Sequence, residues 1–264
     1  MEVISSSQAK QTIENGWKIR KMLSSLYLKK IALNREIPRD NYLSRLPVIS
    51  HLKNMGELKF QSPVTFLVGE NGVGKSTLIE GIAVAMGFNP EGGTVNFNFS
   101  TKESHSNLHE YLAVTRGYKR QRDGFFLRAE SFYNVASNID ELEPTLLPSY
   151  GGKSLHKQSH GESFMALVEN RFGGNGLYIL DEPEAALSPM KLMRLMCIKK
   201  ELVKHDSQFI ISTHSPILMT YPRAEILEIT EEGIQAVDYK ETEHFLITKR
   251  FMDAPERIVE ELFR

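Results

Sequence analysis

The chain has 264 residues, of which 41% are hydrophobic and 25% charged, and its formal net charge is -1, as is typical of a globular protein with one large domain or two small ones. No stretch approaches the roughly 18 consecutive apolar residues of a membrane span, and the N-terminus carries no apolar signal segment, so we expect no direct membrane insertion. Cys197 is the only cysteine, which excludes an internal disulfide and favours a cytoplasmic location.

Charge is distributed unevenly along the chain. Residues 1–59 hold 11 Lys or Arg and 5 Asp or Glu, whereas residues 221–264 hold 6 and 11. A basic front end could contact nucleic acid or an acidic partner, although a solvated surface without a partner is the more common meaning of such a bias. We expect residues 1–24 to form a peripheral extension of a single domain that spans residues 1–264.

The first predicted elements are strands. Apolar residues between Leu26 and Leu33 predict an early strand, and short apolar runs at Leu58–Phe60 and Val64–Val68 predict two more. We interpret the proline-bearing segment between the first two strands as a loop.

A phosphate-binding loop follows the third strand. Residues Gly69–Thr77 read Gly-Glu-Asn-Gly-Val-Gly-Lys-Ser-Thr, which satisfies the pattern G-x-x-x-x-G-K-[ST]. A buried strand precedes the loop and an apolar set at helical spacing follows it, so backbone N–H groups and a helix N-terminus can face a phosphate. Lys75 would reach the β- and γ-phosphates, and the Ser76 hydroxyl would bind Mg²⁺. The residues predicted to hold a nucleoside triphosphate here are Asn71, Gly72, Val73, Gly74, Lys75, Ser76 and Thr77.

Three further strands are predicted in the middle of the chain, at Thr94–Ser100, His109–Thr115 and Gly124–Leu127. The turn between the last two, Arg116–Arg122, is basic and adds to the argument for nucleic acid, because phosphate contacts are made by Lys and Arg. Residues 134–158 are rich in Pro, Gly, Ser and Asn and are interpreted as a loop with a short helix.

A helix is predicted at Ser159–Arg171, and its first turn has two compatible interpretations. Ser159 and Glu162 have the spacing of a capping box, which is a structural feature of helix starts. The same serine, with Gly161 and the helix N-terminus, would also form an anion site suited to a γ-phosphate.

Two acids end the next predicted strand, Leu177–Leu180. An acid at a strand tip beside a phosphate loop can hold Mg²⁺, and a second acid next to it can orient the attacking water. We assign Asp181 to the metal and Glu182 to the water. Two exposed acids before a proline turn are the alternative interpretation.

The remaining elements are a helix at Pro189–Lys204, a buried strand at Phe209–Ser212, a hairpin and a last helix. In the first of these helices we interpret Met193, Met196 and Cys197 as core packing. His214, just after the strand, could bond a γ-phosphate oxygen, although a lone histidine at a strand end is usually only a polar residue of that end.

The motifs, in this order, resemble those of the ABC-type ATPase superfamily. Gly69–Thr77 matches the Walker A motif, Ser159–Glu162 resembles a divergent signature motif, Leu177–Glu182 matches Walker B, and His214 matches the switch histidine. The resemblance implies an α/β fold of the P-loop NTPase class, with a mixed central sheet, flanking helices, an antiparallel β portion and a helical signature-bearing lobe at about residues 100–172. It also implies ATP and Mg²⁺ as cofactors, with Lys75, Glu182 and His214 as catalytic residues.

Within the superfamily the chain is most similar to the soluble SMC, RecF and OLD-type branch, some of whose members act in DNA repair or phage defence beside an effector such as a nuclease. The resemblance implies a homodimer that closes head to tail around two ATP molecules, so that Ser159 and Gly161, with Glu162, belong to the cofactor site of the other copy. Glu130 lies about where the family's Q-loop glutamine is expected, and we include it among the metal-site residues.

Three functions remain open at this point. The first is a Mg²⁺-dependent ATPase whose dimer acts with an effector protein. The second is the ATPase subunit of an ABC membrane transporter, which would contain no membrane span of its own. The third is a nucleotide sensor that does not hydrolyse, against which the paired acids Asp181 and Glu182 argue.

Overall fold

The computed structural model describes residues 26–95, 106–129 and 158–264. Its strands are β1 (Leu28–Leu33), β2 (Leu58–Lys59), β3 (Val64–Val68), β4 (Leu112–Arg116), β5 (Asp123–Arg128), β6 (Gly176–Asp181), β7 (Gln208–Ser212), β8 (Glu225–Ile229) and β9 (Ile234–Ala236). Its α-helices are α2 (Pro47–Met55), α3 (Lys75–Met86), α5 (His160–Arg171), α6 (Pro189–Lys204), α7 (Pro216–Met219), α8 (Glu243–Asp253) and α9 (Pro255–Leu262).

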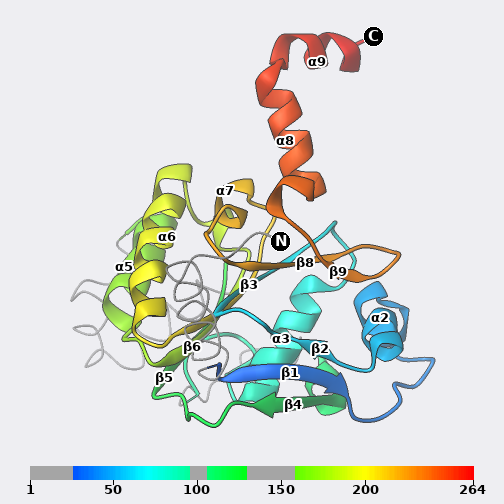
Figure 1. Cartoon of the computed structure of the whole chain (residues 1–264), viewed down its shortest axis with the longest axis vertical. Coiled ribbons are helices and arrows are strands. Elements are labelled where there is room, and N and C mark those ends of the chain that lie inside the picture. The colour runs from blue at the N-terminus through cyan, green and yellow to red at the C-terminus, as the bar shows by residue number, and fades with distance from the viewer. Residues whose placement is uncertain (1–25, 96–105, 130–157) are drawn as a thin grey trace, which may run out of the picture.

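The larger sheet has the strand order β5-β6-β7-β3-β8-β9, in which the first five strands are parallel and β9 is antiparallel to β8. A second, antiparallel sheet has the order β2-β1-β4 (Figure 1). The fold is therefore mixed α/β with a parallel-dominated sheet, flanking helices and an antiparallel portion, as the sequence predicts.

The parallel strands are buried on both faces, and successive residues of a strand point to opposite faces. Leu67 of β3 and Ile179 of β6 pack with α3, whereas their neighbours Phe66 and Tyr178 pack in the cluster that contains α5 and α6. Two hydrophobic layers thus cover the sheet, and α3 and α5 lie on opposite sides of it.

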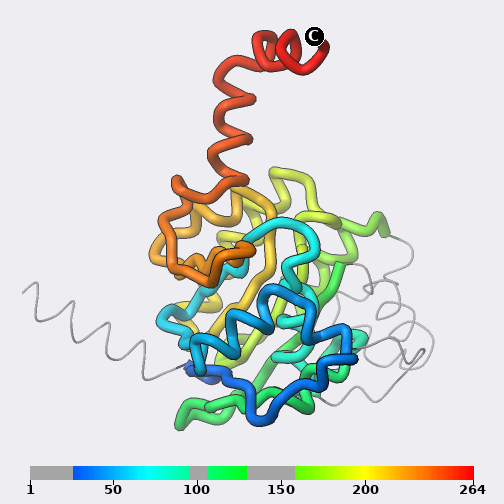
Figure 2. Tube along the Cα trace, turned by 90° about the vertical axis from the view of Figure 1, so that its right-hand side faces the viewer, coloured from blue at the N-terminus to red at the C-terminus, as the bar shows by residue number. Residues whose placement is uncertain are grey.

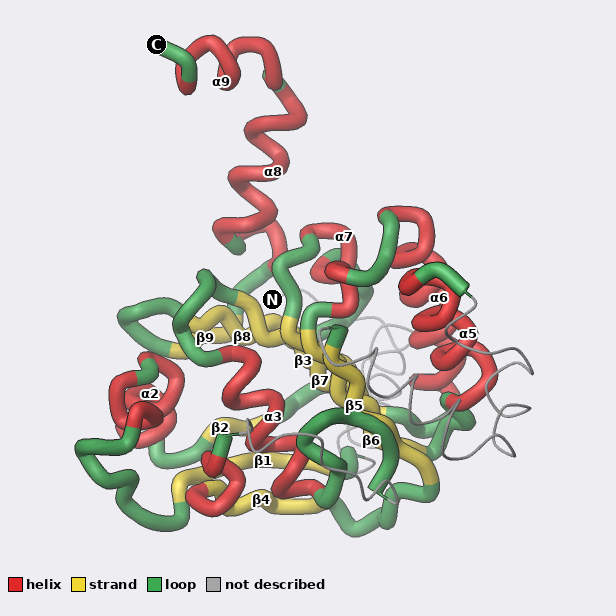
Figure 3. The backbone as a smooth tube through the Cα atoms, turned by 180° about the vertical axis from the view of Figure 1, so that it is seen from behind, coloured by secondary structure: helices red, strands yellow, loops and turns green. Residues whose placement is uncertain are grey.

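Helix α3 lies between the two sheets (Figure 3). The same hydrophobic cluster joins its residues Leu78 and Ile82 to Ile31 of β1 and to Leu227 of β8. This double coverage explains why α3 is apolar on most of its circumference, since a helix buried on two sides needs apolar residues on both.

Helices α8 and α9 leave the body and project away from it (Figures 1 and 2). Several large apolar side chains of this region are exposed to solvent, namely Leu246, Ile247, Phe251, Met252, Leu262 and Phe263. In the part of the chain that the structure describes, no helix is both long enough and apolar enough to cross a membrane.

Two expectations from the sequence are wrong. The segment after β1 contains the helix α2, not only a loop, because Val48, Ile49 and Leu52 give it a buried face. In α6, Met193 and Cys197 are exposed, not in the core. Leu192, Leu195, Lys199 and Leu202 face the sheet instead, and of the three predicted residues only Met196 packs, partly buried, against this hydrophobic cluster. Most of the strand predicted at Thr94–Ser100 lies outside the described residues.

Candidate functional site

The chemistry-bearing residues gather at the carboxyl edge of the larger sheet. The register pairs Leu67, two residues before the phosphate loop, with Ser212 of β7, and pairs Ser212 with Asp181 of β6. Parallel strands end at the same edge, so residues that are far apart in the chain meet there. Lys75 begins α3 at this edge, and His214 follows β7.

The phosphate loop adopts a backbone that needs glycine. Gly69, Gly72 and Gly74 all have positive φ, between 91° and 142°, a region that other residues seldom adopt. A Cβ on Gly74 would lie 2.6 Å from Cγ1 of Val48, because α2 packs directly on the loop. The Val48 N–H also donates to the carbonyl of Val73 at 3.1 Å. Thus α2, which the sequence does not predict, helps to hold the loop in shape.

Lys75 is almost completely buried in this loop, with 4% of its surface exposed. Its Nζ donates to the carbonyl oxygens of Gly69 at 2.8 Å and Glu70 at 2.7 Å. Burial lowers the pKa of Lys75, and the nearby carboxylates of Glu182 and Asp181 oppose that effect. The ammonium is therefore held at the loop by weak neutral partners, which a phosphate oxygen can replace.

Asp181 is buried where two hydroxyl groups and the guanidinium of Arg128 converge. The hydroxyl of Ser212 donates to its Oδ1, Ser76 also hydrogen-bonds it, and Nε of Arg128 lies 3.4 Å from its Oδ2. Burial raises the pKa of Asp181, while Ser212 and Arg128 act against the rise. Arg128 also donates to Glu80 of α3 at 2.6 Å, a link that no motif in the sequence indicates.

Ser76 and Asp181 are a fitting pair for Mg²⁺. Hydroxyl and carboxylate oxygens are the ligands that this ion prefers, and in phosphate-binding loops it takes most of its other ligands from water and phosphate. Among the described residues there is no cluster of three His, Cys, Asp or Glu that could hold a metal by itself. Glu130, the third predicted metal-site residue, lies outside the described residues.

Glu182 has a strained backbone, with φ 48° and ψ 55° in the left-handed region. The backbone N–H of Glu182 points to β7. It donates to Ser212, with its nitrogen 3.1 Å from the Ser212 Oγ and 3.2 Å from the Ser212 carbonyl oxygen. Its Oε1 lies 3.4 Å from Nε2 of His214. The sharp turn after β6 thus brings the Glu182 carboxylate toward His214 and the Lys75 loop.

His214 is held from two sides. Glu184, a buried carboxylate, accepts the His214 backbone N–H and, at 2.8 Å, the Thr213 hydroxyl. On the other side, Nδ1 of His214 lies 2.8 Å from Nε2 of His244, the second residue of α8. Burial, with further contributions from Lys75 and His244, lowers the pKa of His214 to about 4, so its imidazole is neutral at physiological pH. The sequence indicates no role for Glu184 or His244, because each contacts His214 only once the chain is folded and neither belongs to a motif that contains His214.

The predicted anion site at the start of α5 has the expected local form. Glu162 accepts hydrogen bonds from the Ser159 N–H at 2.9 Å and the Ser159 hydroxyl at 2.6 Å, which lowers the pKa of Glu162. Gly161 allows a close approach, since a Cβ there would lie 2.7 Å from the Ala186 carbonyl oxygen. Helix α5 covers the opposite face of the sheet from α3, and the nearest neighbours of Gly161 are Ala186 and Lys191, not residues of the Lys75 loop.

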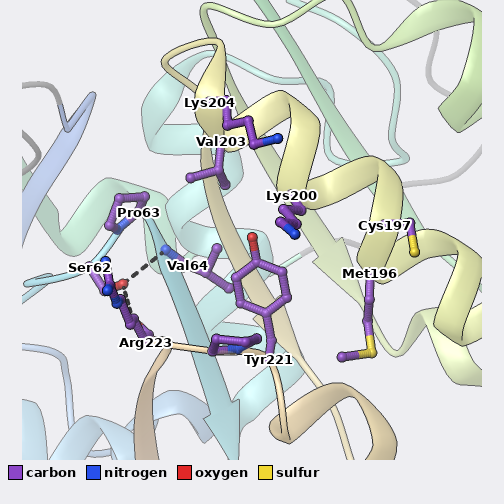
Figure 4. A pocket seen from close by; sticks show the side chains of 11 residues that line it. Ser62, Pro63, Val64, Met196, Cys197, Lys200, Val203, Lys204, Tyr221 and Arg223 are labelled. Carbon is purple, nitrogen blue, oxygen red and sulfur yellow. Dashed lines mark hydrogen bonds between the residues drawn. The ribbon is translucent and has the colours of Figure 1, made fainter.

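A cavity lies at the amino end of β3, away from the phosphate loop (Figure 4). It has a volume of about 560 Å³, and its lining combines apolar side chains with three cationic residues, Lys200, Lys204 and Arg223. Cys197 lines it too, which is a further sign that this residue is not part of the core. None of the predicted phosphate- or metal-binding residues lines this cavity, so it is separate from the site at the carboxyl edge.

Several cations of the basic front end have acidic partners in the structure. Lys30 and Lys59 both pair with Glu57, and Lys53 pairs with Glu36. Arg116, in the predicted basic turn, donates to the carbonyl oxygens of Ala85 and Met86 at the end of α3. These pairings favour the solvated-surface interpretation of the charge bias.

Two family models match the chain. One, described as "AAA domain", matches residues 48–159, and the other, described as "AAA domain, putative AbiEii toxin, Type IV TA system", matches residues 154–220. The two matches together include Lys75, Asp181, Glu182 and His214. No curated protein matches the chain.

Several solved structures are similar to the chain. They include cbiO1 from Clostridium perfringens, described as part of the ABC transporter complex cbiONQ, with 19% identity over 90% of this chain and 100% of that chain and a TM-score of 0.46. An inward-facing, putative metal-chelate type ABC transporter has 12% identity, coverages of 85% and 88% and a TM-score of 0.46. The SMC head domain from Thermotoga maritima has 18% identity, coverages of 81% and 99% and a TM-score of 0.41.

Proposed function

We propose that this chain, which matches two AAA-domain family models, is a P-loop ATPase of the ABC and SMC-like type that binds ATP with Mg²⁺, hydrolyses it, and closes head to tail with a second copy while ATP is bound. The observation that carries the proposal is the meeting of Lys75, Ser76, Asp181, Glu182 and His214 at one edge of the sheet.

Each residue has one task in this proposal. When bound, ATP supplies the phosphoryl group and Mg²⁺ the charge that polarises it. Lys75 exchanges its two carbonyl partners for phosphate oxygens, and Ser76 and Asp181 supply protein oxygens to the metal. Glu182 orients the attacking water, and neutral His214 donates to a γ-phosphate oxygen. Phosphoryl transfer needs mainly this positioning and charge stabilisation.

The start of α5 supports the dimer. Ser159, Gly161 and Glu162 form a helix N-terminus that can bind an anion, yet they lie on the face of the sheet opposite α3. A γ-phosphate on the Lys75 loop of a second copy is a partner that this helix start can reach when two chains pack head to tail. The two active sites would then each be built from both copies, in a single domain that spans the chain.

We also propose that the dimer regulates an effector protein. The family model that matches residues 154–220 is described in terms of a toxin of a toxin–antitoxin system, and this supports a protein partner and a role in defence. The ATPase subunit of a membrane transporter is the alternative, and co-purification of a protein with several membrane spans would favour it.

The decisive experiment uses Glu182→Gln. The amide keeps the shape of the side chain but cannot accept the proton of the attacking water, so we expect hydrolysis to fall by about 10²-fold or more. The variant should bind ATP with Mg²⁺ and become a dimer, measured by light scattering during gel filtration. Glu201→Gln, an exposed change on α6, is the matched control and should hydrolyse ATP like the wild type.

Two further variants assign the dimer to the proposed contacts. In the Glu182→Gln background, Ser159→Ala should weaken the dimer while each monomer still binds ATP, and Lys75→Ala should abolish both binding and dimer. A Glu182→Gln protein that stays monomeric with saturating ATP and Mg²⁺ would overturn the head-to-tail model.

A further inference from the structure

A second histidine reaches the site from a helix that no motif predicts. His244 lies in the first turn of α8, and its Nε2 is 2.8 Å from Nδ1 of His214, with the two rings 4.8 Å apart and tilted by 56°. The root of α8 is fixed to the body, since Thr242 is fully buried and its hydroxyl donates to the carbonyl of Tyr239 at 2.7 Å. The contact is therefore part of the folded structure.

A neutral imidazole carries one hydrogen, so the bond between the two rings has two possible arrangements. In the first, His244 Nε2–H donates to a bare Nδ1 of His214, which then carries its own hydrogen on Nε2. In the second, His214 Nδ1–H donates to a bare Nε2 of His244. The arrangement decides which atom of His214 can donate toward the phosphate loop.

The surroundings favour the first arrangement. Nε2 of His214 faces the Glu182 carboxylate at 3.4 Å, where an N–H is attracted and a lone pair is repelled. Nε2 of His214 and Nδ1 of His244 are both buried and have no hydrogen-bond partner among the described residues. Each arrangement therefore leaves one buried N–H without a hydrogen bond. In the first arrangement that N–H is on His214 and faces the Glu182 carboxylate, whereas in the second it is on Nδ1 of His244 and the carboxylate faces a lone pair, which costs more.

We propose that His244 is a positioning residue that donates to His214 Nδ1 and so keeps the hydrogen of His214 on Nε2, where it can meet a phosphate oxygen. The inference rests on the proposed function only for the role of His214. The hydrogen bond that orients one ring nitrogen sets the chemistry of the other, as it does for histidines that bind metals. The root of the exposed α8–α9 arm thereby becomes part of the hydrolysis site.

The test compares three substitutions that differ in hydrogen-bonding capacity. The amide nitrogen of His244→Gln can replace the donor, His244→Ala has neither donor nor acceptor, and the carboxylate of His244→Glu can only accept. Thr248→Ala, an exposed change further along α8, is the matched control. We expect kcat for ATP hydrolysis to fall about tenfold in the Ala and Glu variants, with KM for ATP changed less than twofold. The Gln variant and the control should stay within about threefold of the wild type.

A spectroscopic measurement separates this inference from the proposed function. In protein with ¹⁵N-labelled histidine, long-range ¹H–¹⁵N spectra report which ring nitrogen carries hydrogen. We expect the Nε2–H form of His214 in the wild type and in His244→Gln, and its loss in His244→Glu. An Nδ1–H form in the wild type, or wild-type kcat in both the Ala and the Glu variants, would overturn the inference. If His214→Ala hydrolyses ATP at the wild-type rate, the proposed role of His214 fails instead, and the spectra still decide the assignment of the hydrogen.

Discussion

Among the described residues, two lysines are buried, and they lie in two different regions of the molecule. Lys75 is 4% exposed at the carboxyl edge of the sheet, and Lys199 of α6 is fully buried against the opposite hydrophobic layer. Lys75 has two carbonyl acceptors and carboxylates nearby. Nζ of Lys199 has no hydrogen-bond partner among the described residues and lies over the rings of Phe66 and Tyr221, at 4.5 and 4.3 Å.

Burial lowers the pKa of both lysines, and it lowers that of Lys199 to about 7. A shifted pKa therefore does not by itself identify a functional lysine. Lys75 differs from Lys199 in its neighbours, which are a loop of glycines with positive φ, an acid at a strand end and a helix N-terminus. Together these groups can bind a phosphate. In the part of the chain that the structure describes, the Nζ of Lys199 contacts only the faces of Phe66 and Tyr221, which attract a cation but supply no group that binds a phosphate.

The largest effect expected from this comparison is that of Lys75→Ala. The variant loses the ammonium that we propose to contact the phosphates, so we expect ATP affinity to fall by about a hundredfold or more, as titration calorimetry with Mg²⁺ would measure. Thermal unfolding without nucleotide should change little, because Lys75 makes only carbonyl contacts there. If the ATP affinity of Lys75→Ala lay within threefold of the wild type, Lys75 would have no greater role in binding ATP than Lys199.

Asp181→Asn sharpens the comparison at the neighbouring acid. Loss of the carboxylate that we propose to hold Mg²⁺ should lower kcat for ATP hydrolysis by about a hundredfold. The raised pKa of Asp181 means that folding favours its protonated form, so the ionised group destabilises the fold above that pKa. The neutral amide should accordingly raise the midpoint of thermal unfolding at pH 7. A lower midpoint, measured by calorimetry in the absence of nucleotide, would show that Arg128 and Ser212 stabilise the anion more than burial penalises it.

Lys199→Met is expected to have the smallest effect, and on stability alone. Methionine fills a similar volume without a buried charge, so we expect a gain of about 1 kcal/mol near pH 6.5, or about 2–4 °C in the unfolding midpoint. ATP hydrolysis should be unchanged. Lys200→Met, the exposed neighbour on the same helix, is the control and should not stabilise the fold. Slower hydrolysis in Lys199→Met, without a change in stability, would contradict the assignment of Lys199 to the core.

The pH dependence of that gain has a definite sign. The unfolded chain holds the Lys199 proton up to about pH 10.5, whereas the folded chain releases it near pH 7. Between these values the unfolded state binds more protons, and wild-type stability rises with pH. The advantage of Lys199→Met should therefore be greatest below pH 7 and shrink toward pH 9, in unfolding curves recorded at several pH values.

Much of this site could be predicted because its chemistry is local. The phosphate loop, the acids after β6 and the capping box at Ser159 are each contained within a few residues, and the register of parallel strands then brings the first two together. The bounds predicted for α6 agree with the structure, because proline begins the helix and a run of suitable residues continues to Lys204.

The remainder depends on contacts between distant parts of the chain. Arg128 and Glu184 have no motif, and they acquire their places only when β5, β6 and β7 lie side by side. Helix α6 carries apolar residues on several sides, so its sequence does not reveal which side meets the sheet, and the prediction that Cys197 lies in the core is wrong for that reason. Helix α8 has no buried residue after Thr242, so nothing in its pattern singled out His244.

Helices α8 and α9 project from the body and expose apolar side chains, so a shortened protein without them would be an obvious choice for crystals or assays. The shortened protein would be more soluble, but it would also lack His244, whose ring contacts His214. Slower ATP hydrolysis by the shortened protein would then reflect the lost contact between His244 and His214, and would not by itself indicate a missing binding partner.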